Sequence, residues 1–237
     1  KAALLGAVAT SAGGCAAIEK HVLPLMQPHY KDMTDDQLAV AVRRIEDEVF
    51  QHFEVRPAIS TKAAVEGVRW VQTLDLSACV GCGRCREACF EENNQNRDPA
   101  TYWITLLRSH HQKIWLLHET ETYDLPPQRE DDGQYYMPTG CQQCEKPSCV
   151  RACPVKATWK EPDGIVVVDY DWCIGCRYCM AACPYSARKF NWAHPTLPGP
   201  DLNPSLHYLG NRPRKYGVVE KCTFCIQRTR KGLYPAC

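Results

Sequence analysis

Cysteine dominates the chemistry available to this chain. The 237 residues include 16 cysteines, and all but Cys15 fall into four closely spaced groups. The first group is Cys79, Cys82, Cys85 and Cys89, the second is Cys141, Cys144, Cys149 and Cys153, the third is Cys173, Cys176, Cys179 and Cys183, and the fourth is Cys222, Cys225 and Cys237. Thiolates are soft metal ligands, so this spacing predicts metal binding at every group.

The spacing within the groups indicates iron–sulfur clusters. The first and third groups follow C-x2-C-x2-C-x3-C, and a proline follows the second and third groups at Pro154 and Pro184. This is the run that binds [4Fe–4S] clusters in bacterial ferredoxins. Three thiolates on a tight loop can take three corners of a cubane, while the fourth points toward a neighbouring cluster. Glycines such as Gly81, Gly83 and Gly175 let backbone N–H groups approach the sulfides.

Three other uses of cysteine explain the spacing less well. Zinc usually takes two C-x2-C pairs, and three cysteines within seven residues are too crowded for that arrangement. Disulfide geometry is rarely satisfied by cysteines only three positions apart. Covalent haem attachment needs C-x-x-C-H, but Arg86 follows Cys85 and Met180 follows Cys179. Zinc and disulfides remain as minor alternatives.

Composition excludes several functional classes. The formal net charge is +1 and charged residues make up 23% of the chain, so it is neither a multi-span membrane protein nor a charge-driven disordered chain. The charge balance also predicts no nucleic-acid partner. No phosphate loop, dinucleotide fingerprint or nucleophile–base motif is present, so we expect no catalytic residues and no small-molecule substrate. Without the cysteines, apolar content falls below the usual share, so clusters are expected to replace part of the core.

Other residues near the groups have secondary roles in this interpretation. Nearby cations are expected to offset the negative charge of the clusters, and nearby aromatic rings are expected to shield the clusters from water. The cations are Arg84, Arg86, Arg151, Arg177 and Lys221, and the rings are Phe90, Trp172, Tyr178, Tyr185 and Phe224.

Periodicity and turn residues predict the elements that position the groups. A helix is expected over 35–53, capped by Thr34 with Gln37. We further expect a strand over 70–76, a hairpin of 101–107 with 113–120 tipped by a solvated His110-His111, a loop over 124–139, a hairpin over 155–169 and an extended surface loop over 194–215.

The stretch Leu4–Ile18 consists mostly of small or apolar residues, which is typical of the core of an export signal, and Lys1 is expected to be what remains of its basic region. Their Ala, Gly and Ser content suits a twin-arginine signal, with the arginine pair expected upstream of Lys1. Ala12-Gly13-Gly14-Cys15 is weakly similar to a lipoprotein cleavage site. An ordinary Ala-rich helix is the alternative.

Taken together, the four groups resemble the four-cluster iron–sulfur subunits of respiratory membrane oxidoreductases. This family serves dimethyl sulfoxide, polysulfide and nitrite reductases, a hydrogenase type and alternative complex III. The resemblance covers about residues 70–237, and the segment Lys221–Arg228 is similar to the family's fourth group. It implies an α+β fold of two interleaved ferredoxin-like domains with hairpin and loop insertions and an N-terminal helical extension.

The resemblance also implies domain boundaries and ligand sets. An export-like segment over 1–18 and an extension over 19–69 precede one domain of 70–140 with 185–237 and another of 141–184. The implied sets are Cys141, Cys144, Cys149 with Cys183; Cys173, Cys176, Cys179 with Cys153; Cys222, Cys225, Cys237 with Cys89; and Cys79, Cys82, Cys85 with a cysteine expected four positions beyond Cys237. Three [4Fe–4S] clusters are thus supported, and a fourth is expected, or a [3Fe–4S] cluster if its last ligand is not cysteine.

The function implied by the resemblance is non-catalytic electron transfer. Electrons would pass between an NrfD-type or similar membrane quinone subunit and a molybdopterin, hydrogenase or multihaem catalytic subunit. The expected location is the periplasmic face of the cytoplasmic membrane, or its cytoplasmic side if no arginine pair precedes Lys1. An iron–sulfur scaffold with structural clusters is the alternative.

Overall fold

The structure is a computed structural model that describes residues 28–110, 113–116 and 135–237. The chain divides into two compact units, Lys1–Ala41 and Val42–Cys237, and each is described by itself. The second unit contains every cysteine group, so the description below concentrates on it. The segment 1–18, Cys15 and the tip of the expected hairpin at residue 111 lie outside the described residues.

Helix α2 (Asp35–Phe53) has the bounds that the sequence predicts. Its capping box forms as expected, because the Gln37 backbone N–H donates to Thr34 Oγ1 at 3.4 Å and the Thr34 N–H donates to Gln37 Oε1 at 2.9 Å. The short 3₁₀ turn η2 (Tyr30–Asp32) precedes it. In the second unit, α2 buries Ile45 and Val49 and exposes the opposite face.

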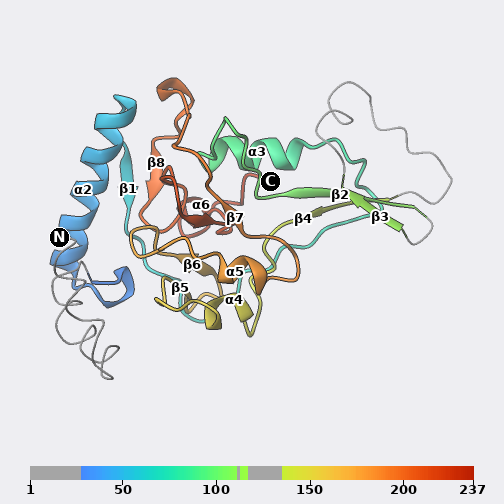
Figure 1. Cartoon of the computed structure of the whole chain (residues 1–237), viewed down its shortest axis with the longest axis horizontal. Coiled ribbons are helices and arrows are strands. Elements are labelled where there is room, and N and C mark those ends of the chain that lie inside the picture. The colour runs from blue at the N-terminus through green and yellow to red at the C-terminus, as the bar shows by residue number, and fades with distance from the viewer. Residues whose placement is uncertain (1–27, 111–112, 117–134) are drawn as a thin grey trace, which may run out of the picture. The chain divides into compact units, whose positions relative to one another are not determined.

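Over its described residues, the second unit contains four small sheets instead of one large sheet (Figure 1). Their strands are β1 (Ala58–Ser60) parallel to β8 (Ser205–His207), β2 (Thr105–His110) between β3 (Lys113–Leu116) and β4 (Tyr135–Thr139), β5 (Thr158–Lys160) antiparallel to β6 (Val166–Val168), and β7 (Lys189–Phe190) antiparallel to β9 (Val219–Glu220). Two of these sheets contain the hairpins predicted near 101–120 and over 155–169. Together with the helices, they confirm an α+β fold at the coarse level.

A short helix accompanies each cysteine group. These helices are α3 (Arg84–Glu92), α4 (Ser148–Arg151), α5 (Tyr178–Ala181) and α6 (Ile226–Thr229). Three of them begin after a residue with a left-handed backbone, namely Gly83 at φ 75°, Arg177 at 63° and Cys225 at 47°. That conformation turns a tight loop directly into a helix. Each loop therefore leads at once into a helix that carries or follows the later cysteines of its group.

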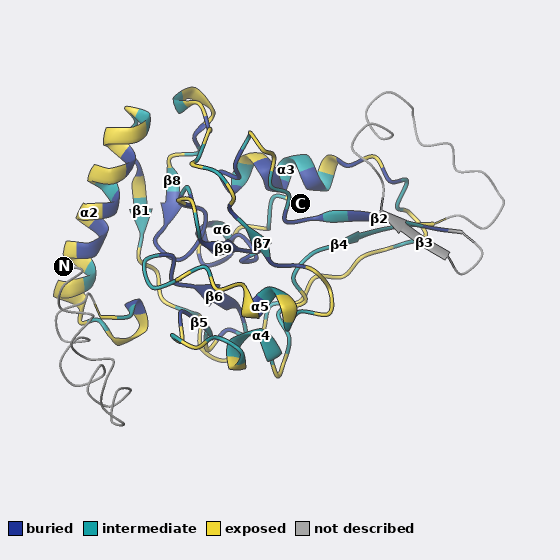
Figure 2. Cartoon of the chain, viewed as in Figure 1, coloured by how far each residue is buried: buried dark blue, intermediate teal, exposed yellow. Residues whose placement is uncertain are grey.

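The core is small and unusually polar. Strand β6 and the segment before it are fully buried, as are Leu206 and Ile226 (Figure 2). Many buried side chains are polar or charged, and these include Asn93, Gln95, Arg188, His207, Arg214, Glu220 and Lys221. Because buried polar groups are costly unless paired, each must be satisfied by the fold or by what the fold binds.

Three sequence predictions are wrong. Residues 70–76 form no strand, because the segment lies against the loop around Cys141 and leaves Val71 and Leu74 exposed. Residues 135–139, predicted as loop, form β4, because their backbone pairs with β2. The prediction of a surface loop over 194–215 is wrong for its second half, where residues 205–207 form β8 and most of residues 206–214 are buried. Asn211 and Arg214 are buried there because their side chains donate to the backbone carbonyls of Glu92 and Asn93 at the end of α3, a contact that sequence distance conceals.

None of the helices in the described part of the chain has the length and apolar content needed to cross a bilayer.

Acid destabilisation is expected at His207. Its Nδ1 accepts the Leu209 backbone N–H at 3.2 Å and its Nε2 lies 3.0 Å from the Lys62 carbonyl, so the buried ring is neutral. Burial, with the nearby charges of Arg230 and Lys231, lowers the pKa of His207 to about 3. Below pH about 6.5 this histidine binds a proton in the unfolded chain but not in the folded chain. The free energy of unfolding therefore falls as the pH is lowered below that value.

The loss attributable to His207 should reach about 1.4 kcal/mol at pH 5.5 relative to pH 7.5. Anaerobic guanidinium unfolding at both pH values measures it. His207→Gln should remove that part of the pH dependence, while the same change at the exposed His194 should retain it. Equal pH dependence in wild type and His207→Gln would contradict this account.

Candidate iron–sulfur site

Every cysteine of the four groups is described, and none of them forms a disulfide. Within the described residues, no three His, Cys, Asp or Glu side chains converge closely enough to hold a single metal ion. The thiols nevertheless lie in sets, in each of which one cysteine is within electrostatic range of the others.

Two of these sets involve the second and third groups. Cys144 has Cys141, Cys149 and Cys183 as its cysteine neighbours, so the last cysteine of the third group lies with the second group. Cys179 has Cys173 and Cys153 as cysteine neighbours, so the last cysteine of the second group lies with the third group. Helices α4 and α5 lie side by side, and the Ser148 hydroxyl donates to the Ala182 carbonyl at 2.7 Å. This packing brings each final cysteine to the opposite loop.

The first and fourth groups meet in the same way. Cys89 on α3 has Cys222, Cys225 and Cys237 as cysteine neighbours. Cys85 has Cys79, Cys82 and also Cys237. The C-terminal end of the chain accordingly lies beside α3 (Figure 1).

Backbone geometry holds the loops in place. Gly175 has φ 70°, and a Cβ atom there would collide with the Gly217 carbonyl oxygen. Only glycine fits this close approach of the third loop to the segment before β9. The same contact places the Val219 N–H 3.4 Å from Cys173 Sγ, and in the fourth group the Phe224 N–H lies 3.4 Å from Cys222 Sγ. Such N–H···S bonds stabilise thiolate ligands.

A buried polar network surrounds Cys89. Gln95 Nε2 donates to Cys89 Sγ at 3.2 Å, and Asn93 Nδ2 lies 3.6 Å from Cys89 Sγ and 3.5 Å from Cys225 Sγ. Gln95 Oε1 in turn accepts the Trp103 backbone N–H at 2.9 Å. The two amides therefore fix the orientation of Cys89 and offer it neutral donors.

A buried ion pair binds the backbone next to these side-chain amides. Arg214 Nε lies 2.5 Å from Glu220 Oε2, with the side chains 1% and 0% exposed. Arg214 also donates to the carbonyls of Asn93 and Asn94 at 2.6 and 2.9 Å. The Trp103 indole N–H donates to the same Glu220 oxygen at 3.1 Å. Asn93 thus depends on a fully buried charge pair for its position.

Two buried cations face the sulfur atoms. Arg188 is 3% exposed, and its Nη2 lies 3.2 Å from Cys149 Sγ and 2.9 Å from Thr158 Oγ1. Its Nε and Nη1 have no hydrogen-bond partner among the described residues. Lys221 is fully buried and lies near Cys141, Cys149 and Cys222, while its ammonium donates to the Cys222 carbonyl at 2.7 Å. Buried cations with free donors fit an anionic group rich in acceptors, which is what a thiolate-bound cluster is.

The thiols themselves are desolvated. Burial raises the pKa of Cys222 to about 12 and that of Cys225 to about 11, and it raises the pKa of Cys89 well above its usual value. Without a metal, these thiols therefore keep their protons at neutral pH. Iron must displace those protons on binding, so these residues fit a cluster that forms together with the fold.

The expected tuning and shielding residues divide into two kinds. Lys221 is buried beside sulfur and Arg86 is buried beside Glu87, whereas Arg84, Arg151 and Arg177 are exposed. Phe90 and Phe224 are buried as expected, and Trp172 is half-buried. The expectation is wrong for Tyr178 and Tyr185, whose side chains are 64% and 50% exposed. Their loops turn these two rings outward into solvent.

Sequence reasoning missed Arg188, Asn93, Gln95 and the Arg214–Glu220 pair. The run Asn93-Asn94-Gln95-Asn96 shortly after Cys89 was a usable indication, because four consecutive side-chain amides are unusual in any sequence. Arg188 and Arg214 carry no such indication, since only the tertiary structure brings them to the cysteines.

Comparison with known proteins agrees with this chemistry. Two models of a 4Fe-4S dicluster domain match, one over residues 78–157 and one over residues 133–201. A selenate reductase subunit of Mesobacillus selenatarsenatis is 32% identical over 98% of this chain and 77% of its own length.

Two further relatives match a shorter part of the chain at higher identity. The iron-sulfur subunit of a putative dimethyl sulfoxide reductase of Halobacterium salinarum is 44% identical over 69% of this chain and 59% of its own length. The iron-sulfur cluster-binding subunit of the menaquinone reductase of Nitratidesulfovibrio vulgaris is 44% identical over 68% and 60%. The chain thus spans about three fifths of these two relatives.

Proposed function

The chain belongs to the family of 4Fe–4S dicluster iron–sulfur subunits of respiratory reductases, and we propose that it relays electrons through four clusters between two partner subunits. The observation that carries this proposal is the grouping of fifteen free cysteines into sets whose last members cross between loops. When bound, each cluster supplies a site that takes up and releases one electron. The protein residues hold these sites, exclude water from them and set their charge environment.

We propose the ligand sets from the cysteine neighbours and the family's crossing pattern. The sets are Cys141, Cys144, Cys149 and Cys183; Cys153, Cys173, Cys176 and Cys179; Cys89, Cys222, Cys225 and Cys237; and Cys79, Cys82 and Cys85. Two interleaved ferredoxin-like domains follow from this crossing, one built from the second and third groups and one from the first and fourth.

Contacts between sets suggest their order. Cys85 of the first group neighbours Cys237, and Cys222 of the fourth group neighbours Cys141. Arg188 in turn has both Cys149 and Cys179 as neighbours. A single path then runs from the set of Cys79 through those of Cys89 and Cys141 to that of Cys173. Cys82 and Cys176, in the two terminal sets, are both exposed.

The partners and location follow from the family as part of the proposal. One partner would be a membrane quinone subunit of NrfD or similar type, and the other a molybdopterin, hydrogenase or multihaem catalytic subunit. The complex would sit at the periplasmic face of the cytoplasmic membrane, reached by twin-arginine export.

Potentiometric EPR on anaerobically purified protein tests the redox role. Cluster signals that change between about −500 and +300 mV support electron transfer, and cluster signals that never change indicate a structural scaffold.

The crossing itself is tested by iron content. Cys183→Ala should lower the iron content by about four atoms, because one complete set loses a ligand. Adding Cys141→Ser should remove no more iron, since both residues belong to one set, whereas adding Cys173→Ser should remove about four more. Cys15→Ser, outside every set, is the matched control and should keep all the iron. If adding Cys173→Ser to Cys183→Ala instead removes no further iron, the crossed assignment is wrong.

A further inference from the structure

Large apolar side chains are exposed together around the third cysteine group. Ile174, Tyr178, Trp192 and Tyr216 are 63%, 64%, 60% and 54% exposed. A group of large apolar side chains exposed to water indicates an interaction surface, because such side chains are otherwise buried. Cys176, which lies between Ile174 and Tyr178 in the chain, is itself exposed.

Contacts join these side chains into one surface. The Arg177 guanidinium carbon lies 4.9 Å from the centre of the Trp192 ring and 5.3 Å from that of Phe190. Gly175 packs directly on Gly217, which brings Ile174 and Tyr216 to the same loop contact. We call Ile174, Arg177, Tyr178, Trp192 and Tyr216 the third-loop face.

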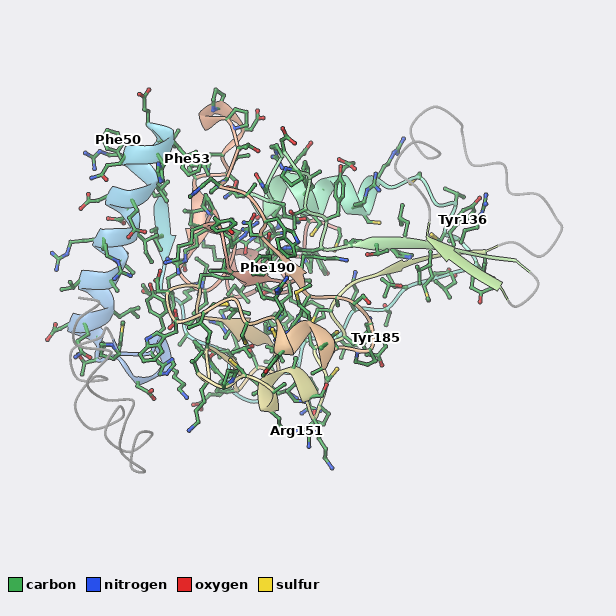
Figure 3. All side chains as sticks on the ribbon, in the orientation of Figure 1. Phe50, Phe53, Tyr136, Arg151, Tyr185 and Phe190 are labelled. Atoms are coloured by element: carbon green, nitrogen blue, oxygen red, sulfur yellow. The ribbon has the colours of Figure 1, made fainter. Side chains whose placement is uncertain are left out.

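The two chain segments that form and flank this face carry cations and no carboxylates. The sequence from 172 to 200 contains no Asp or Glu, and its cations are the exposed Arg177, the half-buried Lys189 and the buried Arg188. The segment 146–160, which includes the adjacent α4, likewise has no Asp or Glu, and its exposed cations include Arg151 and Lys156. Figure 3 shows Arg151 extending outward from α4, with Tyr185 beyond the end of α5 and Phe190 nearer the interior. Asp171, just before the third group, is bound by Arg44, Arg212 and Lys215.

We propose that the third-loop face is the docking surface for an acidic surface of a redox protein, and that electrons pass there at the set that includes Cys176. This inference rests on the proposed function, because it needs a cluster at Cys173, Cys176 and Cys179. Charge complementarity selects the occupant, since exposed cations beside aromatic rings favour a carboxylate-bearing partner. A lipid surface could meet the same charges but could not accept an electron.

Small charged oxidants test the face without the partner. Fully reduced, cluster-loaded protein is mixed under anaerobic stopped-flow conditions with ferricyanide, an anion, or with hexaammineruthenium(III), a cation. Each oxidant molecule takes one electron from the protein, giving ferrocyanide or hexaammineruthenium(II). Arg151→Glu with Arg177→Glu should slow oxidation by ferricyanide about tenfold at low salt, and added salt should abolish the difference. Oxidation by the ruthenium complex should not slow.

A control variant with the same charge change elsewhere completes the design. Lys231→Glu with Lys62→Glu alters two exposed cations beside β1 and β8 and should leave the ferricyanide rate close to that of wild type. Equal slowing by both double variants, or no slowing by either, would overturn the proposal. So would binding of wild type, but not of Arg151→Glu with Arg177→Glu, to phosphatidylglycerol vesicles, which would make the face a membrane contact.

The same stopped-flow oxidation distinguishes failure of the electron-transfer function from failure of the docking surface. Iron content and visible absorbance equal to wild type establish that the variants are folded and loaded. Clusters that can be neither reduced nor oxidised in wild type defeat the proposed function, whereas clusters that react at rates independent of the third-loop face defeat only this inference.

Discussion

Glu220→Gln should lower the stability of the protein by roughly 3–5 kcal/mol, because it leaves the Arg214 guanidinium buried without a counter-charge. Both side chains are at most 1% exposed, and the pair holds the backbone of Asn93 and Asn94 behind Cys89. For a chain of this size, the loss corresponds to a fall of about 6–20 °C in the unfolding midpoint. Anaerobic differential scanning calorimetry measures it directly.

Two comparisons make this prediction specific. Arg214→Met combined with Glu220→Gln should recover part of the loss, since no unpaired charge is then buried. Glu145→Gln removes the ion pairs that the 64% exposed Glu145 makes with Arg69 and Lys160 at the surface, and should leave the midpoint almost unchanged. If Glu220→Gln is as harmless as Glu145→Gln, the buried pair does not support the site as argued.

Arg188→Gln should lower the reduction potential of the two clusters that it faces by on the order of 100 mV. A unit charge at roughly 7 Å and an effective dielectric constant of 20 is worth about 2.4 kcal/mol, which is about 100 mV for a one-electron couple. The sign follows from charge: the reduced cluster is the more negative state, so removing a cation disfavours reduction. Arg188 remains protonated because the neighbouring Cys149, Cys179 and Cys141 outweigh the effect of burial and raise its pKa.

Potentiometric EPR with matched variants isolates this effect. Arg188→Lys keeps the charge and should recover most of the shift, although it loses the planar set of donors. Lys221→Gln should instead lower the potentials of the sets that contain Cys141 and Cys222, leaving that of Cys173 unchanged. Lys146→Gln removes an exposed cation that solvent screens, and should change none. Unchanged potentials in Arg188→Gln would show that this arginine is only structural.

These two predictions concern residues for which no sequence motif indicated a role near the cysteines. The cysteine spacing identified the cofactor, because a run of ligands on one short loop is a local property that needs no knowledge of the fold. For the same reason the helix at 35–53, with its capping box at Thr34 and Gln37, and the hairpin over 155–169 were predictable: periodicity and turn residues lie within a few positions of one another. The resemblance to a known family added the expected crossing of ligands.

Only the tertiary structure decided which side chains surround the sulfur atoms. Arg188 reaches Cys149 from 39 residues away, and Arg214 reaches the backbone of Asn93 from 121 residues away. The region 194–215 reads as an exposed loop because it is rich in prolines and polar residues. Most of residues 206–214 are nevertheless buried, because Asn211 and Arg214 donate to backbone carbonyls at the end of α3. The chain therefore encodes its metal ligands locally, whereas their charge environment depends on long-range hydrogen bonds and ion pairs that no short segment of sequence can specify.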